Sequence, residues 1–189
     1  MGILRIVLLS GPFKVGKSTV TGELVQQFGY LKMSSSDYLR SLSPGVERLE
    51  LAQARLRLQQ AGDDLDRKTD FRWVVDPVAT SAVANAPDAF NWLFDAVRKR
   101  RQVEHFRGKF GSAVMHVHLT APDDALRIRS GLSDTAYGIA ASHPNEVNAR
   151  SLIDIADRVF DTTVQTAHEI AMQINQAGGW YEEASCRHH

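Results

Sequence analysis

GPFKVGKS, at residues 11–18, matches the pattern of glycine, four residues, glycine, lysine and then serine or threonine that is typical of a phosphate-binding loop. An apolar run over residues 3–9 precedes it and predicts a strand buried on both faces. A helical pattern over residues 19–28 follows, and Gly29 lies where that helix should stop. Strand, glycine-rich turn and helix form the context that the motif requires. The sequence therefore predicts a nucleotide-binding site.

The chemistry of phosphate binding explains the spacing. Gly11 and Gly16 let the backbone curl tightly and leave room for phosphate oxygens. The loop amides and the helix N-terminus then form a nest for an anion. Lys17 is expected to reach the β- and γ-phosphates and to act in catalysis, and Ser18 to place its hydroxyl on Mg²⁺. We expect ATP and Mg²⁺ as cofactors, bound by Gly11, Pro12, Phe13, Lys14, Val15, Gly16, Lys17, Ser18 and Thr19.

Composition narrows the class of protein. The 189 residues suggest one domain with a sizeable core. Lys and Arg total 22, as do Asp and Glu, which argues against a nucleic-acid coat or a polybasic membrane anchor. No apolar run approaches the ~20 residues of a membrane span. The lone Cys186 excludes an internal disulfide and fits a reducing cytoplasm. We expect a cytoplasmic protein, monomer or homodimer, that acts on a small molecule rather than on nucleic acid or membrane.

Strand and helix patterns alternate along the chain. Further short strands are expected at residues 30–33, 89–95, 113–119 and 158–161. The predicted helices are 46–61, which Gly62 should end, 71–84, 100–106, 145–155 and 163–177; residues 131–144 show no regular pattern. This alternation predicts an α/β fold with a doubly wound parallel sheet of about five strands. A single domain is expected over residues 1–179, with a C-terminal tail at 180–189.

Asp95 is the candidate acid, for the metal or for catalysis. It ends a predicted buried strand, where an acid often holds Mg²⁺ through a water opposite the loop hydroxyl. It could also act as a base toward an acceptor, and Arg98, three residues further on, supports a functional role. The alternative is an ordinary strand-end aspartate that caps the next turn. Asp76, in the segment VVDP, is the rival metal acid and ranks lower.

A second polar cluster follows the predicted second strand. Short hydroxyls and an arginine fork there suit an acceptor phosphate. A helix cap with a solvated arginine explains the same residues equally well. The candidate acceptor-binding residues, with Arg98, are Ser35, Ser36, Asp37 and Arg40.

Arg127 and Arg129 precede the irregular stretch that ends at Pro144. A mobile flap that carries arginines would exclude water and neutralise charge on the γ-phosphoryl group. The alternative is a pair of surface arginines two residues apart on a helix, which would point in different directions. We expect at least one of the two to be functional. His143 and Glu146 are interpreted as a helix cap.

Two further groups favour structural interpretations. His116 and His118 alternate on a predicted strand and share one face, which favours a core role over metal ligation. The basic run over residues 98–109 favours a solvated helix face over a nucleic-acid patch.

Beyond the loop, the sequence resembles the nucleoside-monophosphate-kinase-like members of the P-loop kinases. SSDYLR at residues 35–40 resembles the Thr-Gly-Asp-x-Leu-Arg segment of adenylate kinases, with Ser36 in place of glycine. GDDLDRKT at 62–69 and FDAVR at 94–98 are similar to segments of phage-type deoxynucleoside monophosphate kinases. The resemblance implies a three-layer P-loop NTPase fold of the kinase type, with strand order 2-3-1-4-5. It also implies an acceptor-binding helical region at about 34–86 and a lid at about 127–146.

The resemblance implies a phosphotransferase that moves phosphate from Mg²⁺-ATP to a nucleoside monophosphate. In that interpretation Arg40 and Arg98 hold the acceptor phosphate, Asp95 orients the metal or acceptor, and Arg127 with Arg129 closes over the γ-phosphate. Two alternatives stay open: a kinase of another small molecule, such as dephospho-coenzyme A or a sugar acid, and a nucleotide-binding regulator without efficient transfer.

Overall fold

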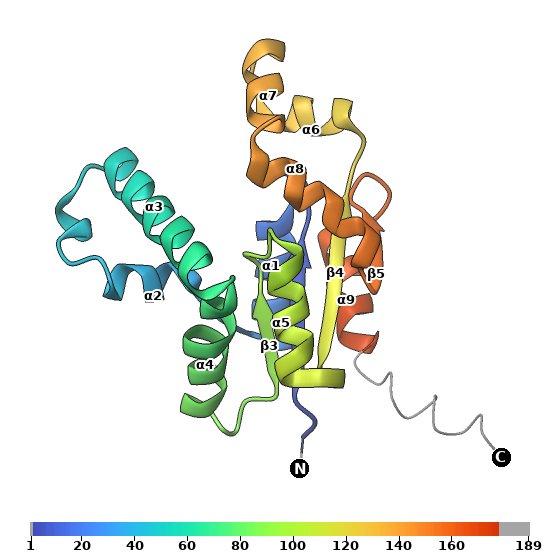
Figure 1. Cartoon of the computed structure of the whole chain (residues 1–189). Coiled ribbons are helices and arrows are strands. Elements are labelled where there is room, and N and C mark those ends of the chain that lie inside the picture. Colours follow the sequence, from blue (N-terminus) through green and yellow to red (C-terminus); the bar gives the residue numbers. More distant parts are fainter. Residues whose placement is uncertain (1, 178–189) are drawn as a thin grey trace.

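The chain folds around a five-stranded, all-parallel sheet with the order β2-β3-β1-β4-β5 (Figure 1). The computed structural model describes residues 2–177. The predicted fold class and strand order are confirmed. The strands are β1 Arg5–Ser10, β2 Leu31–Lys32, β3 Asn91–Phe94, β4 Val114–Thr120 and β5 Arg158–Asp161.

Strand β1 lies in the centre of the sheet because its apolar run can be buried on both faces. Ile6, Val7, Leu8 and Leu9 are each at most 1% exposed. Val7 is in register with a β3 residue on one side and a β4 residue on the other. The phosphate loop therefore begins at the carboxyl end of the most buried strand, where the neighbouring strands support it.

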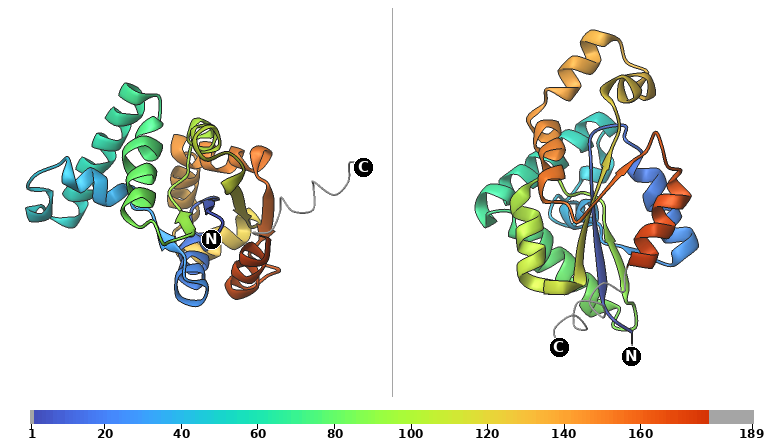
Figure 2. Two further views of the ribbon diagram at one scale, coloured as in Figure 1. Left: turned by 90° about the horizontal axis from the view of Figure 1, so that it is seen from below. Right: turned by 90° about the vertical axis from the view of Figure 1, so that its right-hand side faces the viewer.

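Helices cover both faces of the sheet (Figure 2). Helices α1 and α9 pack together on one face, and α4 and α5 lie on the other. The α-helices are α1 Lys17–Phe28, α2 Ser35–Ser41, α3 Leu51–Thr69, α4 Thr80–Asn85, α5 Arg100–Phe110, α6 Asp123–Ser130, α7 Asp134–Ala141, α8 Pro144–Ser151 and α9 Ala167–Gln176.

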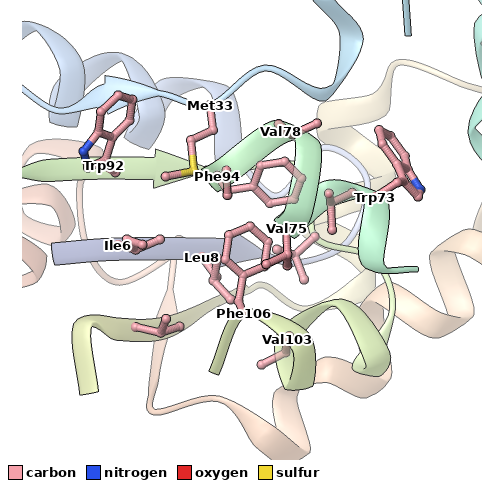
Figure 3. Close-up of a cluster of buried hydrophobic side chains, with 14 of the residues drawn as sticks. Ile6, Leu8, Met33, Trp73, Val75, Val78, Trp92, Phe94, Val103 and Phe106 are labelled. Atoms are coloured by element: carbon pink, nitrogen blue, oxygen red, sulfur yellow. The ribbon is translucent and has the colours of Figure 1, made fainter. Parts of the chain in front are cut away.

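The core is divided by the sheet into two apolar clusters. Figure 3 shows the larger one, in which Phe94 of β3 faces Phe106 of α5 with ring centroids 5.2 Å apart. Trp73 and Val78 join it from the helical segment before β3. The second cluster holds α1 and α9 against the opposite face. Packing on both faces holds the sheet in place, and with it the carboxyl ends of the strands, where the phosphate loop begins.

Helices α2 and α3 form an arm beside the sheet (Figure 1). Helix α3 continues through Gly62 to Thr69, so the predicted stop at Gly62 is wrong. A helical glycine costs only ~1 kcal/mol relative to alanine, and Leu58, Ala61 and Leu65 pack against the core on this helix. Tertiary contacts therefore outweigh the local preference. The helix ends instead where Asp70 and Phe71 adopt positive φ angles of 48° and 63°.

The segment that the resemblance implied as a lid is more regular than expected. Residues 134–141, predicted as irregular, form α7, because Ser133 caps it by accepting a hydrogen bond from the amide of Ala136 at 3.3 Å. Buried Tyr137 anchors this helix. Helix α9 begins at residue 167 rather than 163, after Thr166 and Glu169 form a capping box. The predicted tail at 180–189 lies outside the described residues.

Candidate active site

The phosphate loop has the backbone that its glycines predict. Gly11 and Gly16 have φ angles of 139° and 99°, in the region that side chains rarely adopt. A Cβ atom on Gly11 would lie 2.4 Å from the carbonyl oxygen of Leu119 on β4. The loop therefore packs against β4 so closely that only glycine fits at its first position.

Lys17 is the electrostatic centre of the site. Its ammonium group donates hydrogen bonds to the carbonyl oxygens of Gly11 and Pro12, the second at 3.0 Å. Burial lowers the pKa of Lys17 to about 8; the charge of Glu146 opposes this, that of Arg98 adds to it, and that of Asp95 also opposes it. Two residues predicted from sequence, Asp95 and Arg98, thus lie within electrostatic reach of Lys17.

Asp95 directly follows β3 and is held on the side of the phosphate loop. Its Oδ2 accepts hydrogen bonds from Thr21 Oγ1 at 3.2 Å and from Lys32 Nζ at 2.8 Å, and its side chain is 16% exposed. Asp76 instead lies in a π-helical turn at Val75–Ala79 and pairs with Arg72 at 3.7 Å. Of the two rival acids, Asp95 is the one that the fold places beside the loop.

Glu146, interpreted from sequence as part of a helix cap, reaches across to the loop. Its Oε2 accepts a hydrogen bond from the backbone amide of Phe13 at 2.6 Å. His143 caps α8 as predicted, by accepting from the amide of Asn145 at 3.2 Å. A carboxylate on a loop amide shows that this amide is available to bind an anion. The loop therefore fits the phosphate chain of a nucleotide.

A cavity of about 410 Å³ opens beside the loop, within the range of nucleotide and drug-sized pockets. Arg129 forms part of its wall, where it donates to Thr162 Oγ1 at 2.7 Å and to the Thr162 carbonyl at 2.9 Å. The loop, α1, the segment after β5 and α9 supply the rest of the wall, with Lys14, Val15, Gly16, Ser18, Thr19, Val20, Gln165, Thr166, Ala167 and Ile170.

The two lid arginines point to different partners, as their spacing predicted. Arg127 pairs with Asp134 at 2.8 Å at the start of α7, whereas Arg129 faces the cavity. The sequence interpretation missed Arg150, which pairs with Asp123 at 2.8 Å and donates to the Tyr137 hydroxyl at 3.2 Å. Its spacing of four residues from Glu146 on one helix face was the available signal.

The predicted acceptor-side residues lie in the first turns of α2. Ser34 caps this helix by accepting from the amide of Asp37 at 3.2 Å, and Ser35 and Ser36 follow it. Arg40 pairs with Asp37 at 3.1 Å, and both side chains are exposed. The structure therefore holds Arg40 within its own helix rather than beside Lys17.

An aromatic pair stands next to these residues. Tyr38 stacks on Trp73 with ring centroids 6.0 Å apart. The Trp73 indole in turn donates to Asp66 Oδ1 at 2.7 Å. Burial raises the pKa of Asp66 above its usual value, against the lowering effect of that hydrogen bond. The arm thus presents a partly buried ring and a carboxylate close together.

Oxygen ligands for Mg²⁺ are few on the protein side. Ser18 and Asp95 remain the candidates, and within residues 2–177 no group of three or more His, Cys, Asp or Glu side chains is arranged to hold a metal ion. Separately, none of the helices in the described part of the chain combines the length and apolar character needed to cross a membrane.

Comparisons with known proteins agree with this geometry. The family model described as chloramphenicol phosphotransferase-like protein matches residues 4–178. Adenylate kinase isoenzyme 1 of Cyprinus carpio is 27% identical over 153 residues, which cover 80% of this chain and 74% of that protein.

Solved structures show the same fold. A gluconokinase from Sinorhizobium meliloti 1021 superposes with a TM-score of 0.54 at 14% identity and full coverage of both chains. TT1252 from Thermus thermophilus gives a TM-score of 0.57 at 19% identity, covering 93% of this chain and 98% of the other. The fold is that of the P-loop kinases.

Proposed function

The chain belongs to the chloramphenicol phosphotransferase-like protein family, and on that premise we propose that it transfers the γ-phosphoryl group of ATP to a nucleoside monophosphate. Membership of this family implies the reaction type, a kinase-type phosphotransfer. The nucleoside monophosphate as acceptor is our proposal. It also assigns the donor to the cavity beside the phosphate loop, which is large enough for a nucleoside and is continuous with the loop residues.

The observation that carries the choice of acceptor is the position of Arg98. Its side chain is exposed, and its positive charge adds to the effect of burial, which is the main cause of the lowered pKa of Lys17. Among the described residues its guanidinium has no ion pair, since only its backbone amide is bonded, to Gln102. An exposed guanidinium without an ion pair, within electrostatic reach of the phosphate-binding lysine, favours a second anion at this point, as an acceptor phosphate would provide.

Catalysis in this proposal comes from alignment and charge neutralisation. Lys17 leaves the carbonyls of Gly11 and Pro12 and contacts the donor phosphates. Arg98 orients the acceptor phosphate, and Asp95, already positioned by Thr21 and Lys32, faces the reacting groups. Mg²⁺, held by Ser18 and through water by Asp95, would supply charge neutralisation on the phosphate oxygens.

The arm offers a surface for the acceptor's base. Tyr38 is partly exposed and rigidly backed by Trp73, so its ring suits stacking against a planar heterocycle. The similarity to an adenylate kinase, whose name denotes action on a nucleotide, supports the same class of acceptor.

A hydroxyl acceptor is the second candidate. Asp37 favours it, because this exposed carboxylate stands in the first turn of α2, just after the end of β2, and is paired only with Arg40. Such a carboxylate can accept the proton of an attacking hydroxyl. The name of the family also points to phosphorylation of a small organic molecule.

A coupled assay of ADP release separates these candidates. The panel contains the common nucleoside and deoxynucleoside monophosphates, and gluconate, dephospho-coenzyme A and chloramphenicol as hydroxyl acceptors. Saturable turnover with a monophosphate, lost in Lys17→Ala and reduced about a hundredfold in Arg98→Met, supports the proposal. Turnover confined to hydroxyl acceptors, and abolished by Asp37→Asn, favours the second candidate. Tight ATP binding without any acceptor-stimulated turnover would indicate a nucleotide-binding regulator.

A further inference from the structure

Three buried polar side chains meet beneath the phosphate loop. Ser10, the last residue of β1, places its Oγ 2.7 Å from His116 Nε2 and 2.9 Å from His118 Nδ1. None of the three residues is more than 2% exposed. Ser10 continues the row that begins with Ile6 and Leu8 on the same face of β1, where an apolar residue would be the ordinary choice. Polar groups this deeply buried are costly unless every hydrogen bond is made.

The direction of each hydrogen bond follows from the partners. His116 Nδ1 lies 3.3 Å from the carbonyl oxygen of Ile155, which can only accept, so Nδ1 carries the proton. Burial lowers the pKa of His116 to about 4, so the ring is neutral at physiological pH and its Nε2 is an acceptor. The Ser10 hydroxyl therefore donates to His116. Its oxygen is then left to accept from His118 Nδ1.

The competing partner of Ser10 is weaker. The carbonyl oxygen of Val117 lies 3.5 Å from Ser10 Oγ, much farther than His116 Nε2. The chain of donors thus runs from His118 through Ser10 and His116 to the backbone of Ile155. Each member has one partner for its proton, and the arrangement fixes a single tautomer for both histidines.

The lower end of this chain is anchored to another helix. The backbone amide of His116 donates to Asp157 Oδ2 at 2.7 Å. Arg107 of α5 donates both to Asp157 Oδ1 at 2.8 Å and to the Ile155 carbonyl at 2.9 Å. Helix α5 therefore holds the segment between α8 and β5, and that segment holds His116.

The upper end lies under the reacting groups. Ser10 immediately precedes Gly11, whose carbonyl accepts a hydrogen bond from Lys17. Burial, with smaller contributions from His116 and Lys17, lowers the pKa of His118 to about 4. His118 is thus within electrostatic reach of Lys17 and is kept neutral, so it adds no positive charge below the phosphates.

We propose that His118 is a positioning residue for phosphoryl transfer, and that it acts by donating the Nδ1 hydrogen bond that holds Ser10 at the start of the phosphate loop. The inference rests on the proposed kinase function. Lys17 must leave the Gly11 and Pro12 carbonyls when a nucleotide binds, so the loop loses two internal hydrogen bonds at that moment. The bond from His118 to Ser10 keeps the loop's first residue in place while Lys17 moves.

Two near-isosteric variants separate this role from a purely structural one. The amide nitrogen of asparagine can occupy the position of histidine Nδ1, and that of glutamine the position of Nε2. His118→Asn retains the donor to Ser10, whereas His118→Gln and His118→Leu remove it. Urea unfolding of each variant measures its stability, and the binding assays use only samples shown to be folded. A loss of affinity or of kcat can then not be caused by unfolded protein.

The readouts are the dissociation constant of ADP, measured by calorimetry, and kcat with the acceptor identified by the panel above. We expect His118→Asn to keep ADP affinity and kcat within about threefold of wild type, and His118→Gln and His118→Leu to lose about tenfold in both, the usual effect of one buried hydrogen bond. Ser10→Ala combined with His118→Leu should be no worse than Ser10→Ala alone, because Ser10→Ala already removes the bond from His118 together with the bond that Ser10 donates to His116.

Three results would overturn the inference: wild-type ADP affinity and kcat in His118→Leu, equal losses in the Asn and Gln variants, or additive losses in the double variant. The ADP measurement also keeps the two proposals apart. If wild-type protein shows no acceptor-stimulated turnover but the expected order of ADP affinities holds, the proposed function fails and the assignment of His118 to the loop stands.

Discussion

Glu146 of α8 places its carboxylate on the backbone amide of Phe13 in the phosphate loop, at 2.6 Å. This carboxylate also acts on Lys17, whose pKa it raises against the lowering effect of burial. Nucleotide phosphates and Glu146 therefore compete for the same amide and the same ammonium group. Glu146 lies in the first turn of α8, so this contact links α8 to the phosphate loop.

Glu146→Gln should bind ADP and inorganic pyrophosphate more tightly than wild type. The substitution removes the competing charge from the loop amide, and a charge-assisted hydrogen bond lost from the free state should raise affinity about threefold to tenfold. Calorimetric titration measures the effect. Glu50→Gln is the matched control, because Glu50 is an exposed acid at the start of α3 and is remote in sequence from the loop. Unchanged or weaker binding in Glu146→Gln would contradict the competition.

The pH dependence of kcat/KM for ATP should report the ionisation of Lys17. Its pKa is about 8 in the free protein, so the charged form that attracts phosphate predominates below pH 8 and is lost as the pH rises through that value. We expect kcat/KM to fall above pH 8. Glu146 raises this pKa, so the falling limb should move to lower pH in Glu146→Gln. A limb that stays in place would show that another group titrates.

Asp95→Asn should lower kcat about a hundredfold while the KM for ATP changes little, because in the proposed function the carboxylate faces the reacting groups, and Asp95 does not line the nucleoside cavity. Steady-state kinetics with saturating acceptor measures both constants. Asp76→Asn provides the control, since Asp76 lies in the π-helical turn and pairs with Arg72. If Asp76→Asn lost as much kcat as Asp95→Asn, the assignment of Asp95 as the functional acid would be wrong.

A pair of glycine substitutions tests the fit of the loop. In Gly11→Ala the new Cβ would clash with the Leu119 carbonyl, and alanine would have to adopt a φ of 139°. The loop must therefore shift, at a cost of about 1–3 kcal/mol in backbone strain alone. We expect this shift to abolish ADP binding. Gly22 lies within α1 with open space around it, and Gly22→Ala should stabilise the protein by about 0.5–1 kcal/mol. Urea unfolding and ADP titration check both. Wild-type ADP affinity in Gly11→Ala would show that the loop tolerates a side chain.

Local patterns predicted most of the elements and failed where tertiary contacts decided. The central strands were predictable because β1 and β3 are short apolar runs between turn residues. Gly62 was misjudged because packing on one face of α3 outweighs its low helix propensity. Helix α7 was not predicted because its sequence has only a weak helical pattern of apolar residues. A single cap and the buried Tyr137 stabilise it. The preference for Asp95 over Asp76 depended on locating β3 correctly.

The sequence by itself predicted the phosphate loop and the alternation of strands and helices that indicates a parallel sheet, because these depend on residues that are adjacent in the chain, whereas the strand order was implied by the family resemblance. The contacts of Glu146 with Phe13, and of Ser10 with His116 and His118, span 133, 106 and 108 residues. No local pattern encodes a hydrogen bond across such a separation. The fold alone brings these groups together, and with them it sets the pKa of Lys17, the acid that faces it and the support beneath the loop.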